Sequence, residues 1–480
     1  MRSYADLIQS CDQNIREGQA DIAKSQLKGL NTNHVPPAQR LPLARLCRRT
    51  GLYSVGLKLL TKSVLLHEDA TPHEMAEYAV LLLRSGAVSE AIARLKMVDA
   101  REVPQAFLYR SFGHFLIWEF AAAAKELEQY LRTPLSPIDR LIGSVNLAMA
   151  MVELRRSKEA SERLAEAIEL AKALSHIQLE STCRSLWAQL HMQNGDFANA
   201  KIELQTARSL TSQTFTNDNF LTTKCEMLID GLESKQVAPL IRLKEYAIKN
   251  KFWEASREAE MYALKLKFDP DLYLQLVCGT PFAGFRNLVR EELGPHSHSL
   301  DYTFGDKTVS PLNLHTGTLD GKQLLNPGKL THRMLEVLLR DFYQPPRVTA
   351  LFSELFPGEY FNITSSPLRV RQALKRTRTW LRANQIPVSI EESRGFYFLK
   401  ILGPFAFQIP IDRRPVEPLI QQIDTLSNSF GEGQIFLAKE AQSVLNVPKW
   451  QVIRILRAGI EKGKIERIGE SQRTTKYKIA

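Results

Sequence analysis

The sequence predicts a multidomain chain in which an all-α helical superhelix is followed by two smaller α+β domains. Three observations lead to this prediction. The first 290 or so residues have a helical pattern with a regular recurrence of small residues, whereas two later segments each combine short strands with helices and end in a hairpin. The excess of positive charge lies in the later part of the chain. A chain of 480 residues is also too long for a single hydrophobic core.

In the first part of the chain, a turn position is followed five residues later by a small residue. The pairs are Gly18 with Ala23, Gly51 with Gly56, Gly86 with Ala91, Trp118 with Ala123, Arg155 with Ala160, and Gly195 with Ala200. Successive turn positions are 33, 35, 32, 37 and 40 residues apart. This pattern resembles tetratricopeptide repeats, which have a period of about 34 residues and small residues where the two helices of a hairpin touch. The resemblance implies a superhelix of stacked hairpins over residues 1–293.

Stacked hairpins of this kind commonly present a concave surface to a peptide or a partner helix. The resemblance therefore implies a protein or peptide partner for the array. The alternative is that the array only spaces the later domains or joins two chains as a homodimer. Residues 294–300, which are rich in Gly, Pro, His and Ser, are predicted to be the linker into the basic part of the chain.

Residues 301–402 are predicted to order a small sheet, three helices and a hairpin. Strands are expected at 302–309 and 316–324, and the helices at 330–342, 350–356 and 367–381. Pro345 and Pro346 stop the first of these helices. The hairpin spans residues 388–401, with its tight tip at Arg394-Gly395.

The third of these helices separates apolar from cationic residues. Val370, Leu374, Thr377 and Leu381 recur at helical spacing and are expected to face a core. The outward face then has the residues Arg369, Arg371, Gln372, Lys375, Arg376 and Arg378. Such side chains can bond phosphates and base edges in a major groove. The alternative for a lone run of charges is a solvated helix face.

Seven short motifs in this segment resemble the winged-helix DNA-binding domain of the OmpR/PhoB class of bacterial response regulators. They are Phe304-Gly305, Leu319-Asp320-Gly321, Leu330-Thr331, Leu338-Leu339, Pro346-Arg347-Val348, Phe356-Pro357-Gly358 and Arg394-Gly395. The resemblance implies that Lys375, Arg376 and Arg378 contact the major groove and that Arg394 enters the adjacent minor groove. The segment departs from the family pattern at Thr377 and at 396–398, and no phospho-acceptor domain is recognisable upstream.

After a predicted linker at 403–415, residues 416–480 form a second domain of similar character. Helices are expected at 416–426, 438–445 and 449–462, with Val452, Leu456 and Ile460 inward in the last, and strands at 434–437, 463–469 and 477–479. This order resembles a generic bacterial helix-turn-helix with a wing. The candidate DNA contacts are Lys449, Gln451, Arg454, Arg457 and Arg473. Many winged helices mediate only protein contacts, which is the alternative here.

The charge distribution favours a polyanionic partner. Residues 301–480 contain 26 Lys and Arg against 17 Asp and Glu, whereas the first 300 residues contain 37 against 35. A basic excess raises the rate and the non-specific affinity of association with nucleic acid. Duplex DNA is favoured over single strands because few exposed aromatic residues are predicted for base stacking.

The sequence therefore predicts a cytoplasmic bacterial transcription regulator that binds double-stranded DNA. No apolar run is long enough to cross a membrane, and the five cysteines are scattered and predicted to be reduced core thiols. No enzymatic activity, cofactor or metal is expected, since residues 279–284 lack the Lys of a phosphate-binding loop and no hydrolase or metalloprotease motif is present. The alternative function is a non-catalytic scaffold subunit of a larger complex, in which the winged helices mediate protein contacts.

Overall fold

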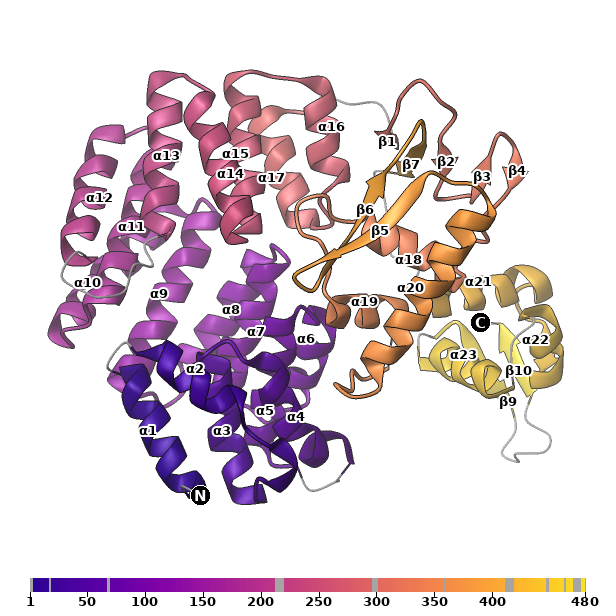
Figure 1. Cartoon of the computed structure of the whole chain (residues 1–480), viewed down its shortest axis with the longest axis horizontal. Helices are drawn as coiled ribbons and strands as arrows, with labels where there is room; N and C mark the ends of the chain where they lie inside the picture. Colours follow the sequence, from indigo (N-terminus) through magenta and orange to yellow (C-terminus); the bar gives the residue numbers. More distant parts are fainter. Residues whose placement is uncertain are drawn as a thin grey trace.

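The computed structural model describes residues 3–16, 19–66, 70–211, 220–295, 301–357, 359–410, 418–445, 449–461, 463–468 and 476–479. The described chain divides into a helical array up to residue 293, a central unit at 301–410 and a C-terminal unit at 418–479 (Figure 1). None of the described helices combines the length and the apolarity that a membrane crossing requires.

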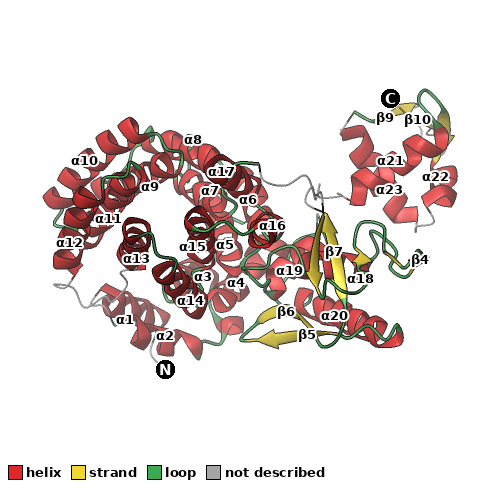
Figure 2. Ribbon diagram, turned by 90° about the horizontal axis from the view of Figure 1, so that it is seen from above, coloured by secondary structure: helices red, strands yellow, loops and turns green. Residues whose placement is uncertain are grey.

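The helical array is a tetratricopeptide-like superhelix of antiparallel hairpins (Figure 2). Its helices are α1 (Tyr4–Arg16), α2 (Ala20–Lys28), α3 (Pro37–Arg49), α4 (Tyr53–Thr61), α5 (Pro72–Ser85), α6 (Val88–Lys96), α7 (Gln105–Leu116), α8 (Phe120–Leu131), α9 (Pro137–Glu153), α10 (Ser157–Ala173), α11 (Ile177–Gln193), α12 (Phe197–Thr211), α13 (Phe220–Ser234), α14 (Ala238–Asn250), α15 (Trp253–Leu266), α16 (Pro270–Cys278) and α17 (Ala283–Leu293).

The predicted turn positions are confirmed wherever the structure describes them. Gly51, Gly86 and Gly195 have left-handed backbones with φ of +75°, +99° and +78°. Trp118 and Arg155 adopt the same conformation at +60° and +57°, although side chains rarely favour it. The left-handed residue ends the first helix and lets the second fold back against it. Gly18 lies outside the described residues.

The small residues five positions later sit where the two helices of a hairpin touch. Ala23, Ala91, Ala123, Ala160 and Ala200 are all fully buried. At Gly56 of α4, an added Cβ atom would lie 3.4 Å from the carbonyl oxygen of Ala44 in α3, its hairpin partner, and 2.9 Å from the Cδ1 atom of Leu81 in α5, the first helix of the next hairpin. The close approach of the helices therefore requires the small side chain.

One further hairpin, α13–α14, departs from the sequence pattern. Its turn is the left-handed Lys235, with φ of +55°, and the residue five positions later is Leu240. The small residue lies instead on the preceding helix, where a Cβ atom on Gly231 would be 2.8 Å from Leu240 Cγ. The helices are again in close contact, but here the small residue, Gly231, is on the first helix of the hairpin and the large one, Leu240, is on the second.

The five cysteines are all buried and none forms a disulfide. Burial raises the pKa of the Cys47 and Cys183 thiols to about 12. Their predicted position in the core is confirmed.

The central unit follows the predicted order of small sheet, three helices and hairpin. Its elements are β1 (Asp301–Gly305), β2 (Leu312–Asn313), β3 (Thr318–Leu319), β4 (Lys322–Gln323), α18 (Leu330–Leu338), α19 (Val348–Leu355), α20 (Ser366–Ala383), β5 (Val388–Ser393), β6 (Phe396–Ile401) and β7 (Ala406–Pro410). β3 pairs with β4 and β5 with β6, whereas β7 lies between β1 and β2.

Several boundaries of this unit were predicted wrongly. The strand predicted at 302–309 ends at Gly305, and the strand predicted at 316–324 is the short pair β3 and β4. Residues 406–410 were assigned to a linker at 403–415, but they form β7, which pairs with β1 from Asp301–Pro410 to Gly305–Ala406. The flanking prolines suggested a linker, yet Phe407 and Ile409 are fully buried. In addition, α18 ends at Leu338 rather than at 342, because Phe342 packs on the array and its N–H donates to the carbonyl of Gly279 at 2.9 Å. Most of the predicted linker at 294–300 lies outside the described residues.

The central unit and the start of the array share one hydrophobic core. Buried residues of α5, such as Tyr78 and Leu81, belong to the same cluster as Leu351, Phe352 and Phe361. Polar bonds reinforce this contact, since the Tyr78 hydroxyl donates to the carbonyl of Phe361 at 2.8 Å. The two parts are therefore packed together as one body.

A second contact joins the central unit to the far end of the array. Arg257 of α15 is fully buried and pairs with Glu254 at 2.7 Å and with Asp341 of the central unit. Burial lowers the pKa of Arg257, but the two carboxylates outweigh burial and raise it. The guanidinium thus stays charged in the interior, where it bonds both parts.

The C-terminal unit has a core of its own. Its elements are α21 (Pro418–Phe430), β8 (Ile435–Leu437), α22 (Ala438–Leu445), α23 (Lys449–Glu461), β9 (Ile465–Ile468) and β10 (Lys476–Ile479), with β10 central in the sheet. Its core residues include Ile423, Leu426, Phe436, Val452, Ile455 and Leu456. The sequence placed Ile460 inward as well, but it is 37% exposed, and Ile455 is buried instead.

Enlarging the small residue of a hairpin should destabilise the array. We expect Ala123→Leu to lower the free energy of unfolding by about 1–3 kcal/mol, because the packed helix interface has no room for the larger side chain. Ala121→Leu is the matched control, since Ala121 is exposed on the same helix and should change stability by about 0.5 kcal/mol or less. Denaturant titration followed by circular dichroism measures both, and equal effects would contradict the packing argument.

Candidate nucleic-acid interface

The basic helix predicted at 367–381 is α20, and its inward face is confirmed. Val370, Leu374, Thr377 and Leu381 are each buried. The hydroxyl of Thr377 donates to the carbonyl of Ala373 at 3.0 Å, which satisfies its polar group inside the core.

The helix ends through local backbone geometry. Gln385 is left-handed with φ of +55°, and the N–H of Ile386 donates to the carbonyl of Leu381 at 2.9 Å. This closure starts β5 beside the helix.

Four of the six predicted outward residues lie free on the exposed face of α20. Arg371, Gln372, Lys375 and Arg376 are all exposed, and the three cations among them make no ion pair with a described residue. The surface is hollowed beside them, over a stretch lined by Gln372, Lys375, Arg376, Thr379, Trp380 and Ala383. Trp380 and Arg382 extend this face, although neither was among the six outward residues predicted from the sequence.

The other two outward residues are engaged within the central unit. Arg369 pairs with Glu359 at 3.1 Å, and its guanidinium lies 4.0 Å from the ring centroid of Phe356. The hydrogen bonds that Arg369 donates to the carboxylate of Glu359 raise the pKa of Arg369. Arg378 donates from Nε and Nη2 to the carbonyl of Ile390 at 3.2 and 2.8 Å, and so joins α20 to β5. Both side chains therefore position the helix and the hairpin.

The hairpin β5–β6 has the predicted tight tip. Arg394 and Gly395 have φ of +52° and +81°, and both positions of a two-residue turn of this kind require left-handed backbones. Arg394 is exposed at the tip.

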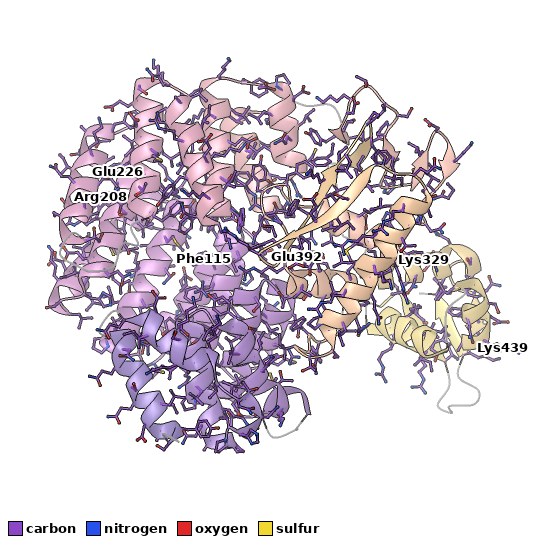
Figure 3. All side chains as sticks on the ribbon, viewed as in Figure 1. Phe115, Arg208, Glu226, Lys329, Glu392 and Lys439 are labelled. Carbon is purple, nitrogen blue, oxygen red and sulfur yellow. The ribbon has the colours of Figure 1, made fainter. Side chains whose placement is uncertain are left out.

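The same hairpin also contacts the array. The Phe396 ring lies edge-on to Trp253 of α15, with 5.7 Å between centroids. The tip extends toward the array in both views (Figures 1 and 2), and Figure 3 labels Glu392 at this end of the hairpin. A duplex that reaches Arg394 would thus approach the α14–α15 turn.

Only part of the second predicted interface is described. Arg457 of α23 is exposed. The side chains of Lys449, Gln451 and Arg454, and the whole of Arg473, lie outside the described part of the chain. The described surface of the unit exposes several large apolar side chains, namely Ile435, Leu437, Val444, Ile453, Ile460 and Ile468.

No family model and no curated protein matches the chain. Among solved structures, the chain is similar to a Rap protein complexed with Competence and Sporulation Factor, at 13% identity and a TM-score of 0.42 over 60% of this chain and 91% of that one. It is also similar to a tetratricopeptide repeat protein from Parabacteroides merdae (13% identity, TM-score 0.34, 60% and 97% covered). It is similar as well to the apo form of RapI, at 11% identity and a TM-score of 0.35 over 60% of this chain and 85% of that one.

Removing the guanidinium of Arg378 should loosen the hairpin. We expect Arg378→Gln to lower stability by about 1–3 kcal/mol, because the carbonyl of Ile390 loses both of the bonds that Arg378 donates. Hydrogen exchange at residues 388–401 should become faster. Arg382→Gln, which removes an exposed guanidinium from the same helix, should leave exchange unchanged; comparable protection in the two variants would contradict the positioning role.

Proposed function

We propose that residues 301–410 are a winged-helix DNA-binding domain of the OmpR/PhoB type and that the protein is a transcription regulator binding double-stranded DNA. The observation that supports this most directly is the exposed face of α20. It presents Arg371, Lys375 and Arg376 without an ion pair to any described residue. Cations left without carboxylate partners are available to phosphates and base edges.

The spacing of these residues suits a major groove. Arg371, Gln372, Lys375 and Arg376 lie one turn apart in pairs along the same face of α20. A major groove about 12 Å wide admits one helix, and Arg and Gln make two-bond contacts with guanine and adenine edges. In this proposal Arg369 and Arg378 orient the helix rather than touch DNA, and Arg394 at the hairpin tip supplies the minor-groove contact.

We propose further that the array binds a protein or peptide partner. A hollow of about 620 Å³ lies between α8, α9 and α10. Arg132, Arg140 and Arg163 line it together with Glu128 and Glu166. Such a mixture of charges suits the polar backbone and side chains of a peptide. The protein as a whole would then be a non-catalytic, cytoplasmic regulator, and a homodimer is the alternative use of the array.

The C-terminal unit favours a second role, contact with protein. Its described surface exposes Ile453 and Ile460 on α23, beside Arg457. It also exposes Ile435 and Leu437 on β8, which lies at an edge of its sheet. Clustered exposed apolar side chains are typical of protein-binding surfaces rather than of phosphate contacts. For this unit we therefore favour contact with another protein, as in the scaffold function, over contact with DNA.

Replacing the central cations of α20 should abolish sequence-specific DNA binding. In selection from a random duplex library at physiological salt, we expect wild type to enrich a motif and Lys375→Ala/Arg376→Ala to enrich none. If each cation contacts one phosphate or base, the variant should bind non-specific DNA with a salt slope lower by about 2.

The matched control replaces two exposed array cations, Lys96→Ala/Arg101→Ala. It should enrich the same motif as wild type. No enrichment by any protein, or equal enrichment by both variants, would favour the scaffold function for the whole chain.

A further inference from the structure

A second hollow, of about 420 Å³, lies between the array and the central unit. The array lines it with the α5–α6 turn, the end of α7 and the start of α15. The central unit lines it with the segment after α18, with α19 and with Phe396 of β6. Small-molecule sites are typically about 300–1,000 Å³ and often lie between domains. This hollow has the size and the position of such a site.

Positive charge predominates in the lining. Arg84, Lys251, Arg340 and Arg347 face two carboxylates, those of Asp341 and Glu354. Both carboxylates are already engaged, Glu354 with Arg340 at 2.5 Å and Asp341 with the buried Arg257.

The other three lining cations have no such partner. Arg84, Lys251 and Arg347 make no ion pair with any residue that the structure describes. The hollow thus contains positive charge that the protein itself leaves uncompensated.

Two of these cations are held around one aromatic ring. The Nζ atom of Lys251 lies 5.0 Å and the Cζ atom of Arg347 lies 4.5 Å from the centroid of Phe396. One comes from the array and the other from the central unit. The two charged groups are therefore at most 9.5 Å apart, the sum of their distances to the ring centroid, and like charges at this separation repel each other at ordinary salt, where the screening length is about 8–10 Å. An anion beside the ring would replace this repulsion with attraction to both.

The backbone that bears both cations is ordered before any ligand arrives. Lys251 is a left-handed turn residue with φ of +64°, and the next N–H donates to the carbonyl of Ala247 at 2.8 Å. Arg347 forms a β-bridge with Phe396, and the N–H of Tyr397 donates to the carbonyl of Pro346 at 3.0 Å. Prior ordering of this kind lowers the entropic cost of binding.

The rest of the lining adds an apolar wall and one free polar group. Phe396, Trp253, Phe282 and Leu116 present apolar surface. The hydroxyl of Ser353 is buried and has no hydrogen-bond partner among the described residues. The lining therefore places apolar surface beside the cations, and such surface suits the uncharged part of a ligand.

We propose that this hollow binds a small organic anion, a carboxylate or phosphate ester with an apolar or aromatic part. Lys251 and Arg347 bind its charged group, and Phe396 and Trp253 contact its apolar part. The site joins the array to β6 of the hairpin and to α19. If the proposed DNA-binding function holds, the anion and DNA influence each other's affinity through the hairpin, and by linkage the effect is reciprocal.

The test uses the full chain and an aromatic sulfonate, anilinonaphthalene sulfonate, as a fluorescent probe. We expect saturable binding by wild type that inorganic pyrophosphate displaces. Lys251→Gln/Arg347→Gln should weaken the displaceable component by about tenfold or more, since each cation supplies a charge-assisted contact. Lys96→Gln/Arg101→Gln removes the same charge from exposed positions of the array and should bind as wild type does.

Arg84→Gln provides a second variant that leaves both Phe396 contacts in place, and it should weaken binding to a smaller extent. Circular dichroism on each variant separates loss of the site from loss of the fold. Absence of displaceable binding by wild type, or equal binding by Lys251→Gln/Arg347→Gln, overturns the proposal.

A third result also overturns it. If the same variant binds DNA more weakly and with a shallower salt dependence, while wild type binds neither probe nor pyrophosphate, the cations belong to a DNA backbone contact. The probe is titrated without DNA, so failure of the library selection does not affect this test.

Discussion

The contact between the α5–α6 hairpin and the central unit determines how every other surface is presented. The left-handed Gly86 ends α5 so that the carbonyl of Ser85 accepts a hydrogen bond from the hydroxyl of Thr349 in α19. Five residues after Ser85, the carboxylate of Glu90 accepts the N–H of Phe361 at 3.1 Å. Burial raises the pKa of Glu90, although Arg94 and Phe361 lower it in part. Backbone and side chain thus bind the central unit at both ends of the segment before α20, over a common apolar core.

This docking separates the two elements on which DNA binding would depend. The face of α20 that bears Lys375 and Arg376 is exposed, and neither cation has an ion pair with a described residue, whereas β6 packs Phe396 on Trp253. The helix is accessible as the structure stands, and the hairpin is shared with the array. A change in the curvature of the array at α14–α15 would therefore reach the hairpin through Trp253 and the segment after α18 through Arg257. The interdomain hollow lies at this junction, since Lys251 and Phe396 both line it.

The C-terminal unit differs from the central unit because it buries a core of its own. Its apolar cluster contains only its own residues, so it needs no packing against the array to bury a core. It nevertheless leaves Ile435, Leu437 and Ile460 exposed. The central unit thus packs part of its apolar surface on the array, whereas the described core of the C-terminal unit contains no residue of the array.

The sequence alone determined the features that local backbone geometry controls. The hairpin turns at Gly51, Gly86 and Gly195, the inward face of α20 and the tip at Arg394-Gly395 follow from φ preferences and helical period, which act over a few residues. Tertiary structure decided the rest, because the partners lie far apart in the chain. β7 is a strand because β1 and β2, which lie about a hundred residues earlier in the chain, pair with it on either side. Arg378 faces Ile390 rather than a groove, and Lys251 meets Arg347 at Phe396, for the same reason: long-range packing selects which polar groups meet.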